Sequence, residues 1–138
     1  MKIPDGEQRL VNVCPCGSRY PHGLCCGPFL SGEAEPQTAE ALMRSRYTAY
    51  IQANIDYLIE TYAARKRNRL RPDKMRHSIK STRWIGLEII SILDGRAEHN
   101  TGEVEFKARF IFDGRVQELH ERSRFIREEG LWRYWGHV

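Results

Sequence analysis

Four cysteines stand close together near the start of the chain and are the residues with the clearest chemical potential. They are Cys14, Cys16, Cys25 and Cys26, in the sequence C-P-C-G-S-R-Y-P-H-G-L-C-C, and the chain has no other cysteine. Thiolates are strong ligands of zinc, and two closely spaced pairs can form a tetrahedron around one ion. The sequence therefore predicts a metal site, with zinc as the expected ion and iron as the alternative. Four protein ligands leave no position for a reactive water, so we expect a structural role.

Disulfide bonds and a redox pair are the alternative uses of these thiols. A bridge between Cys25 and Cys26, or between Cys14 and Cys16, would be strained. The N-terminal residues also lack the apolar stretch of a secretory signal, and a chain of 138 residues can form a core without disulfide bonds. A thioredoxin-type pair needs C-x-x-C spacing, which neither pair has. We therefore expect metal-bound thiolates in a reducing, bacterial-type cytoplasm.

The cysteine segment also carries a resemblance to known proteins. The run C-P-C-G-S followed by Cys25-Cys26 resembles the SEC-C motif, the zinc-binding tail of the bacterial preprotein translocase ATPase SecA. Four further segments are similar to the uncharacterised YchJ-type bacterial proteins: residues 26–32, 38–47, 102–110 and 119–125. The resemblance implies an SEC-C-type zinc-binding segment over residues 1–30 and a nuclear-transport-factor-2-like domain over residues 31–138. It implies no established activity.

Two residues of the loop depart from the SEC-C pattern. Arg19 stands where the motif usually has a second glycine, which affects the turn but no ligand. His22 stands where the motif usually has an aromatic residue. It could replace one thiolate as a ligand. Because four thiolates already complete a tetrahedron, we expect it to be a surface ring near the metal.

Helix signals follow the cysteine segment. Thr38 is a suitable N-cap, and apolar residues then recur at helical spacing as far as Ile51. Asn54 can cap a second helix. Pro72 can occupy the first turn of a third helix that ends near Lys80. No apolar run is long enough to span a membrane.

The second half of the chain is strand-like. Residues 84–93, 103–112 and 115–126 are rich in β-branched and aromatic side chains. The dipeptide Asp113-Gly114 predicts a two-residue hairpin turn, which sets Phe112 opposite Arg115 and fixes the register. This register places three pairs of opposite charge on one face: Glu103 with Arg124, Glu105 with Arg122, and Arg109 with Glu118.

A last strand is predicted after a four-residue loop over residues 127–130. That loop would set Trp132 opposite Phe125 and Tyr134 opposite Ser123. Together the elements predict an α+β fold, in which a polar lead-in over residues 1–13 and a zinc-binding loop precede three helices packed on a curled, antiparallel sheet of about four strands. This is the nuclear-transport-factor-2-like (cystatin-like) cone that the resemblance implies.

Glu121 is the main polar residue on the apolar face of the predicted sheet. An isolated carboxylate there must find a donor, change its pKa or reach a cavity. It could act as a general base in a pocket, but we favour a structural salt bridge to Arg44 or Arg46. The predicted pocket residues are Trp84, Phe106, Phe110, Glu121, Ser123, Trp132 and Tyr134. No Ser-His-Asp arrangement or phosphate loop accompanies them, so an enzyme is the less favoured class.

A basic run is the third candidate site. Its cations could bind the phosphates of RNA or ribosomes, or anionic lipids, and they are Arg65, Lys66, Arg67, Arg69 and Arg71. The formal net charge of +4 is compatible with such partners but does not require them. The run contains no aromatic residue that could stack on bases, so sequence-specific recognition is not expected. The alternative is a solvated link between two helices.

These observations favour a zinc-stabilised protein-binding module of the bacterial cytoplasm without enzymatic activity. In SecA the similar motif binds the chaperone SecB, so the resemblance implies a protein partner for residues 14–26. The first alternative is a small-molecule-binding pocket, or a hydrolase- or isomerase-like enzyme, centred on Glu121. The second is nonspecific association with RNA or ribosomes through residues 65–76.

Overall fold

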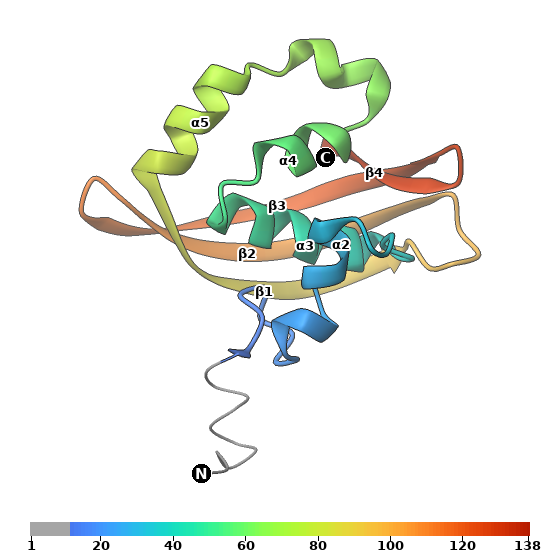
Figure 1. The fold of residues 1–138 in the computed structure, drawn as a ribbon, viewed down its shortest axis with the longest axis horizontal. Helices are drawn as coiled ribbons and strands as arrows, with labels where there is room; N and C mark the ends of the chain where they lie inside the picture. The colour runs from blue at the N-terminus through green and yellow to red at the C-terminus, as the bar shows by residue number, and fades with distance from the viewer. Residues whose placement is uncertain (1–11) are drawn as a thin grey trace.

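The computed structural model describes residues 12–138, so residues 1–11 of the predicted polar lead-in lie outside the described part. Helices come first and a sheet follows (Figure 1). The helical elements are a 3-10 helix (His22–Leu24), α2 (Gly27–Ser31), α3 (Ala39–Ile51), α4 (Ile55–Glu60), a second 3-10 helix (Ala64–Arg69) and α5 (Pro72–Ser81). The strands are β1 (Thr82–Asp94), β2 (Thr101–Phe112), β3 (Arg115–Glu128) and β4 (Leu131–His137). The predicted α+β fold is confirmed.

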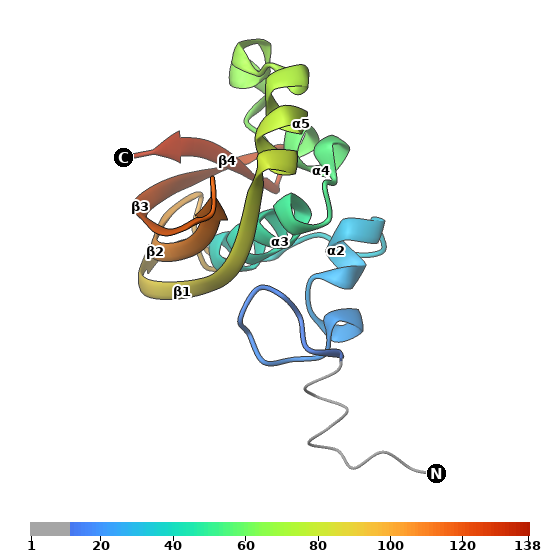
Figure 2. The same cartoon turned by 90° about the vertical axis from the view of Figure 1, so that its left-hand side faces the viewer.

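The strands form one antiparallel sheet in the order β1-β2-β3-β4. The sheet curls around α3, which packs against its inner face, while α5 leads directly into the start of β1 (Figure 2). Register shifts in β1 lie between Trp84 and Gly86 and between Ile89 and Ser91. Such bulges bend a strand and increase its twist, so they contribute to the curl of the sheet.

Both predicted helix caps are confirmed. The side chain of Thr38 accepts a hydrogen bond from the Ala41 N–H at 3.1 Å, and Asn54 Oδ1 accepts one from the Tyr57 N–H at 3.1 Å. The third predicted helix is α5, which begins at Pro72 as expected. Helix α2, a short helix directly after the cysteine segment, was not predicted. No helix within residues 12–138 is long and apolar enough to cross a membrane.

The predicted register of the β2–β3 hairpin is confirmed. Phe112 pairs with Arg115 across a turn whose two residues, 113–114, have φ values of 52° and 74°. Two successive left-handed residues are what a type I′ turn requires. On the outer face of the hairpin, Nη2 of Arg122 lies 3.4 Å from Oε1 of Glu105, the residue opposite to it.

The predicted register between β3 and β4 is wrong. The loop has two residues rather than four, because Glu129 and Gly130 take left-handed conformations, with φ values of 53° and 82°, and close a tight turn. Tyr134 therefore lies opposite Phe125 rather than Ser123, and a bulge further along β3 shifts the remaining pairs. Because the error is an even number of residues, it leaves the inward-facing side chains of β4 on the predicted face.

The core lies between α3 and the inner face of the sheet. Four of its large side chains are at most 1% exposed: Leu42, Val104, Phe125 and Trp132. Three of the cysteines, Cys14, Cys16 and Cys26, belong to the same buried cluster. In the described part of the chain, the cysteine segment and the helix–sheet domain therefore share one core.

Candidate functional site

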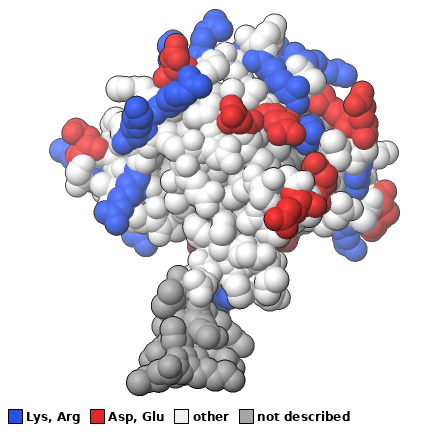
Figure 3. Space-filling view, viewed as in Figure 1, with Lys and Arg blue, Asp and Glu red and all other residues white. Residues whose placement is uncertain are grey.

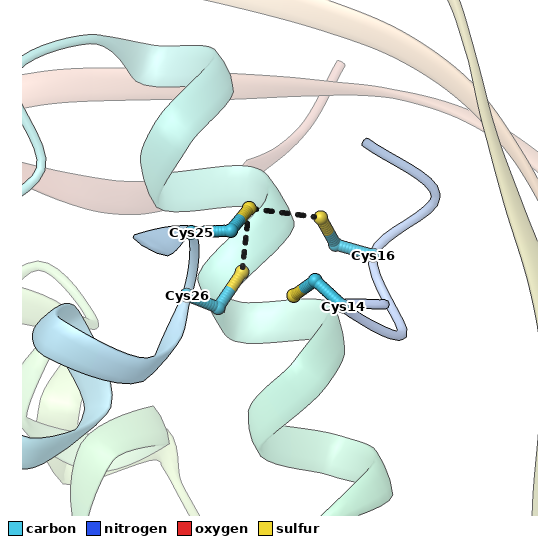
Figure 4. A group of neighbouring side chains, drawn as sticks. All are labelled: Cys14, Cys16, Cys25 and Cys26. Carbon is cyan, nitrogen blue, oxygen red and sulfur yellow. Dashed lines mark hydrogen bonds between the residues drawn. The ribbon is translucent and has the colours of Figure 1, made fainter. Parts of the chain in front are cut away.

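The side chains of the four cysteines converge on one point (Figure 4). All four sulfur atoms lie within 4.8 Å of one another. Sγ of Cys25 is 3.5 Å from Sγ of Cys16 and 4.0 Å from Sγ of Cys26. Four sulfur ligands at about 2.3 Å from a tetrahedral metal are about 3.8 Å apart, so the cluster has the right size. These four cysteines could therefore hold one metal ion.

Two stretches of backbone bring the cysteine pairs together. The Cys14 N–H donates to the carbonyl oxygen of Tyr20 at 2.8 Å, and Val13 forms an antiparallel bridge with Pro21. These contacts close the loop on the side of the first pair. The second pair stands between the first 3-10 helix and α2, so its position is set by two short helices.

The two departures from the SEC-C pattern both lie beside the sulfur cluster. Arg19 has a φ of 71°, a left-handed conformation that glycine adopts without steric cost. The usual glycine of the motif therefore has a physical reason at this position. His22 is half-buried, and its Nδ1 lies 3.4 Å from Sγ of Cys14. The ring is thus a neighbour of one sulfur atom, outside the set of four.

The charge balance of the cluster favours a bound cation. Burial raises the pKa of Cys25 to about 11, and hydrogen bonding with Cys14 raises the pKa of Cys26 well above its usual range. The pKa of Cys16 is lowered instead, because Cys14 and Cys26 donate hydrogen bonds to its sulfur. Ionisation of Cys16 thus opposes ionisation of Cys25 and Cys26. A divalent ion at the centre would stabilise all four thiolates together.

Helix α3 and its C-cap residue, Gln52, support the loop with three side chains spaced four residues apart. Nη1 of Arg44 donates to the carbonyl oxygen of Cys16 at 2.7 Å. Oγ1 of Thr48 lies 3.8 Å from Sγ of Cys14, and Nε2 of Gln52 lies 3.3 Å from Nε2 of His22. Residues four apart share one helix face, so a single stripe of α3 holds the loop. Sequence reasoning missed this stripe as part of the metal centre.

A cavity of about 260 Å³ lies between α3 and the inner face of the sheet. Five of the seven predicted pocket residues line it: Trp84, Phe106, Glu121, Ser123 and Tyr134. Helix α3 contributes four residues that were not predicted for the pocket: Met43, Arg46, Tyr47 and Tyr50. Their spacing of three and four residues was visible in the sequence, but spacing alone does not say which helix face meets a cavity.

The other two predicted pocket residues, Phe110 and Trp132, lie elsewhere. The ring of Phe110 packs against Trp84, with the ring centroids 5.0 Å apart. Trp132 is opposite Arg127 in the sheet and is 1% exposed, and its Nε1 donates to the carbonyl oxygen of Gln37 at 3.1 Å. The shorter β3–β4 loop explains the displacement of Trp132, because it moves the pairing of β4 along β3 by two residues.

Glu121 lines the cavity and is half-buried. The favoured salt bridge to Arg44 or Arg46 does not form. Arg44 pairs instead with Glu40 at 2.8 Å, and Arg46 donates to Leu58 and Thr61. Within residues 12–138, the Glu121 carboxylate has neither an ion pair nor a hydrogen bond.

The basic run forms the second 3-10 helix and its flanks. Lys66 and Arg67 are engaged internally: Nζ of Lys66 donates to the Trp135 carbonyl at 2.6 Å, and Nη2 of Arg67 donates to the Glu60 carbonyl at 2.6 Å. Arg65, Arg69 and Arg71 are exposed. Basic side chains gather along the upper rim of the molecule, over α5 and the segment before it (Figure 3).

A comparison with known protein families matches most of the chain. The family model of the middle, nuclear-transport-factor-2-like domain of YchJ matches residues 38–136. The chain belongs to the YchJ family. The matched residues run from the N-cap of α3 nearly to the end of β4, so they include the cavity and leave out the cysteine loop.

Curated relatives extend the YchJ similarity over most of the chain. A UPF0225 protein of Streptomyces coelicolor, SCO1677, is 47% identical over 122 residues, which are 88% of this chain and 90% of that protein. A UPF0225 protein of Serratia proteamaculans is 39% identical over 133 residues, which are 91% of this chain and 82% of that protein.

Two solved structures share the fold. The solution structure of RPA3114, a SEC-C motif containing protein from Rhodopseudomonas palustris, has a TM-score of 0.83 and 34% identity, covering 91% of this chain and 96% of that chain. The crystal structure of a SEC-C motif containing protein from Psychrobacter arcticus has a TM-score of 0.78 and 26% identity, covering 91% and 82%. The YchJ-type fold, with a cysteine loop of SEC-C type before a nuclear-transport-factor-2-like domain, is thus confirmed.

Proposed function

We propose that this protein is a zinc-stabilised module that binds another protein in the cytoplasm and has no enzymatic activity of its own. Cys14, Cys16, Cys25 and Cys26 would hold the zinc ion. Zinc prefers four tetrahedral ligands in structural sites, and four thiolates leave no place on the ion for water or substrate. The ion would therefore fix the shape of the loop and supply no reaction.

The observation that carries the proposed binding role is the exposure of two large apolar side chains on this loop. Leu24 is 80% exposed and Tyr20 is 66% exposed. Both border a groove between the loop and α3, which is also lined by Phe29 and Ala41. A large apolar side chain held in solvent by a rigid loop is typical of a contact residue at a protein interface.

The distribution of charged side chains also favours the cysteine loop as the protein-binding surface. On the face drawn in Figure 3, the visible described surface at the lower centre, where the cysteine loop lies, shows few charged side chains. Depletion of charge is typical of the centre of a protein interface. The resemblance of the loop to the SecA motif, which binds a protein, supports the same class of partner. Association with RNA has less support, because Lys66 and Arg67 are already engaged by main-chain carbonyls.

Site-specific photo-crosslinking in the native host tests this proposal. A photoreactive amino acid replaces Leu24 in one variant and Val116, which is 58% exposed at the β2–β3 hairpin, in the control variant. We expect a discrete adduct with one protein from position 24 alone, identified by mass spectrometry. Adding Tyr20→Asp to the same chain should remove the adduct. Similar adducts from both positions, or no adduct from position 24, would contradict the proposed role.

A further inference from the structure

Arg46 is a buried cation in the wall of the cavity, in the middle of α3, and is 5% exposed. Its Nη1 donates to the carbonyl oxygen of Leu58 at 2.8 Å and to Oγ1 of Thr61 at 2.6 Å. Within residues 12–138 it has no carboxylate partner, and its Nε and Nη2 donate no hydrogen bond. A buried guanidinium without a counter-charge is costly unless acceptors meet its N–H groups.

Two aromatic rings hold this guanidinium but do not supply those acceptors. Cζ of Arg46 lies 4.6 Å from the ring centroid of Tyr134 and 5.9 Å from that of Tyr62. The faces of the rings stabilise the positive charge. Nε and Nη2 make no hydrogen bond within residues 12–138, and no fully buried side-chain nitrogen or oxygen there lacks a partner, so these two groups have accessible surface. Burial lowers the pKa of Arg46, in line with a charge that is incompletely compensated, although an arginine remains protonated.

Glu121 is the second charged residue of the same cavity. As described above, it forms no ion pair with Arg46 and no hydrogen bond within residues 12–138. The cavity therefore presents one cation and one anion that do not neutralise each other directly. Aromatic rings also line the cavity, and Trp84 packs against both Tyr47 and Tyr50, with ring centroids 6.2 Å apart in each pair. The volume of about 260 Å³ is slightly below the usual range for ligand cavities, which favours a small molecule over a nucleotide.

We propose that this cavity binds a small zwitterionic carboxylic acid of amino-acid size. The carboxylate accepts hydrogen bonds from the free N–H groups of Arg46, the amino group donates to Glu121, and the apolar part lies against Trp84. Guanidinium and carboxylate are matched in geometry and form charge-assisted hydrogen bonds. This site lies on the opposite side of α3 from the cysteine loop, so it is independent of the proposed protein-binding role.

The pairing of charges explains why both ends of the ligand matter. A simple carboxylic acid would meet Arg46 but would be repelled by the carboxylate of Glu121. A simple amine would meet Glu121 but leave Arg46 uncompensated. Charges that meet inside a protein interact more strongly than in bulk water, so a molecule with only one of the two charges loses part of its binding energy. Selectivity for the zwitterion follows.

Titration followed by NMR tests this proposal with matched probes. One series is L-phenylalanine, 3-phenylpropionate and 2-phenylethylamine, and a second, aliphatic series is L-leucine, 4-methylpentanoate and 3-methylbutylamine. The signals to follow are the indole N–H of Trp84 and the Nε–H of Arg46. In at least one series we expect the amino acid to bind on the order of tenfold more tightly than the acid or the amine, since each removed group costs a charged hydrogen bond.

Two variants separate recognition from folding. Glu121→Gln keeps the shape of the side chain and is expected to remove the preference for the amino acid over the plain acid. Arg46→Lys is expected to weaken binding of both the amino acid and the plain acid. Because Arg46 also donates hydrogen bonds to Leu58 and Thr61, the folding of this variant is checked by the dispersion of its NMR spectrum. If Arg46→Lys does not fold, Glu121→Gln decides alone. The proposal is overturned if no amino acid shifts the cavity signals, if the amine or acid binds equally well, or if Glu121→Gln leaves the preference unchanged.

Discussion

Arg44 donates a hydrogen bond of 2.7 Å from its Nη1 to the main-chain carbonyl of Cys16, which ties the middle of α3 to the cysteine loop. Glu40 holds the same guanidinium at 2.8 Å from the preceding helical turn. Arg46, which is two residues after Arg44 in the same helix, faces the cavity. One helix therefore carries the candidate metal centre on one side and the candidate ligand site on the other.

Loss of the hydrogen bond from Arg44 to the Cys16 carbonyl should weaken metal binding by the cysteine loop. In Arg44→Met the Cys16 carbonyl loses a charged donor, and we expect zinc release to a chelator to become several-fold faster and the free energy of unfolding to fall by about 1 kcal/mol. Arg76→Met is the matched control, because Arg76 is exposed and, among the described residues, its only ion pair is with Asp73. Equal release rates for the two variants would contradict the supporting role of Arg44.

The backbone of Arg19 predicts a stabilising substitution. Its φ of 71° is unfavourable for any residue with a Cβ atom. Arg19→Gly should therefore raise the free energy of unfolding by about 0.5 kcal/mol, since the greater freedom of glycine in the unfolded chain offsets part of the gain. Arg19→Ala removes the same side chain but keeps Cβ, so denaturant unfolding should show no gain for it. An equal increase in the free energy of unfolding of both variants would mean that the Arg19 side chain, and not the left-handed backbone, is the cause.

Gly17 predicts the opposite effect. It has a φ of 82°, and a Cβ atom added there would lie 2.8 Å from the carbonyl oxygen of Leu87 in β1. Gly17→Ala should therefore destabilise the protein by about 2 kcal/mol, because both the backbone and the contact with β1 are strained. Gly23→Ala serves as the control, since an added Cβ meets nothing within 4 Å there. Thermal unfolding that ranks the two variants equally would mean that the loop does not pack on β1 as described.

Metal removal should destabilise the cysteine loop without unfolding the helix–sheet domain. Cys14, Cys16 and Cys26 belong to the main core, but most of the buried residues of that core, such as Leu42 and Phe125, come from α3 and the sheet. We expect chelation to lower Tm by roughly 5 °C or more while most far-ultraviolet circular dichroism persists. Complete loss of the sheet signal, or an unchanged Tm, would show that the loop and the domain are coupled differently.

Glu105 should make stability fall in acid. Its pKa is lowered, chiefly by the hydrogen bond from His120 at 2.8 Å and next by Ser91. A carboxyl group whose pKa is lower in the folded state stabilises the fold above its ordinary pKa of 4.5, and this contribution is lost as the pH falls below that value. Glu105→Gln should flatten the pH dependence of unfolding below pH 4.5, whereas Glu98→Gln at an exposed loop position should not. If unfolding depends on pH in the same way for both variants and the parent protein, Glu105 does not have this stabilising role.

Much of the candidate metal centre could be predicted, because its four ligands lie within one short loop. The cavity was predicted only in part. Its sheet residues follow from the alternation of side chains in the hairpin, which explains the correct placement of Glu121 and Phe106. The contribution of α3 depended on how the helix rotates against the sheet, and Trp132 was misplaced because the turn at residues 129–130 is shorter than expected.

The sequence by itself determined the features that arise within a few residues. Thr38 caps the helix that begins at the next residue, and the turn at residues 113–114 sets the hairpin register, because partners close along the chain meet without help from the rest of the fold. Only the tertiary structure decided that Arg46 would be buried beside the cavity without a carboxylate partner among residues 12–138, and that Lys66 and Arg67 would bind main-chain carbonyls. Those outcomes depend on how distant segments pack, and the identity of a charged residue does not reveal which groups will surround it.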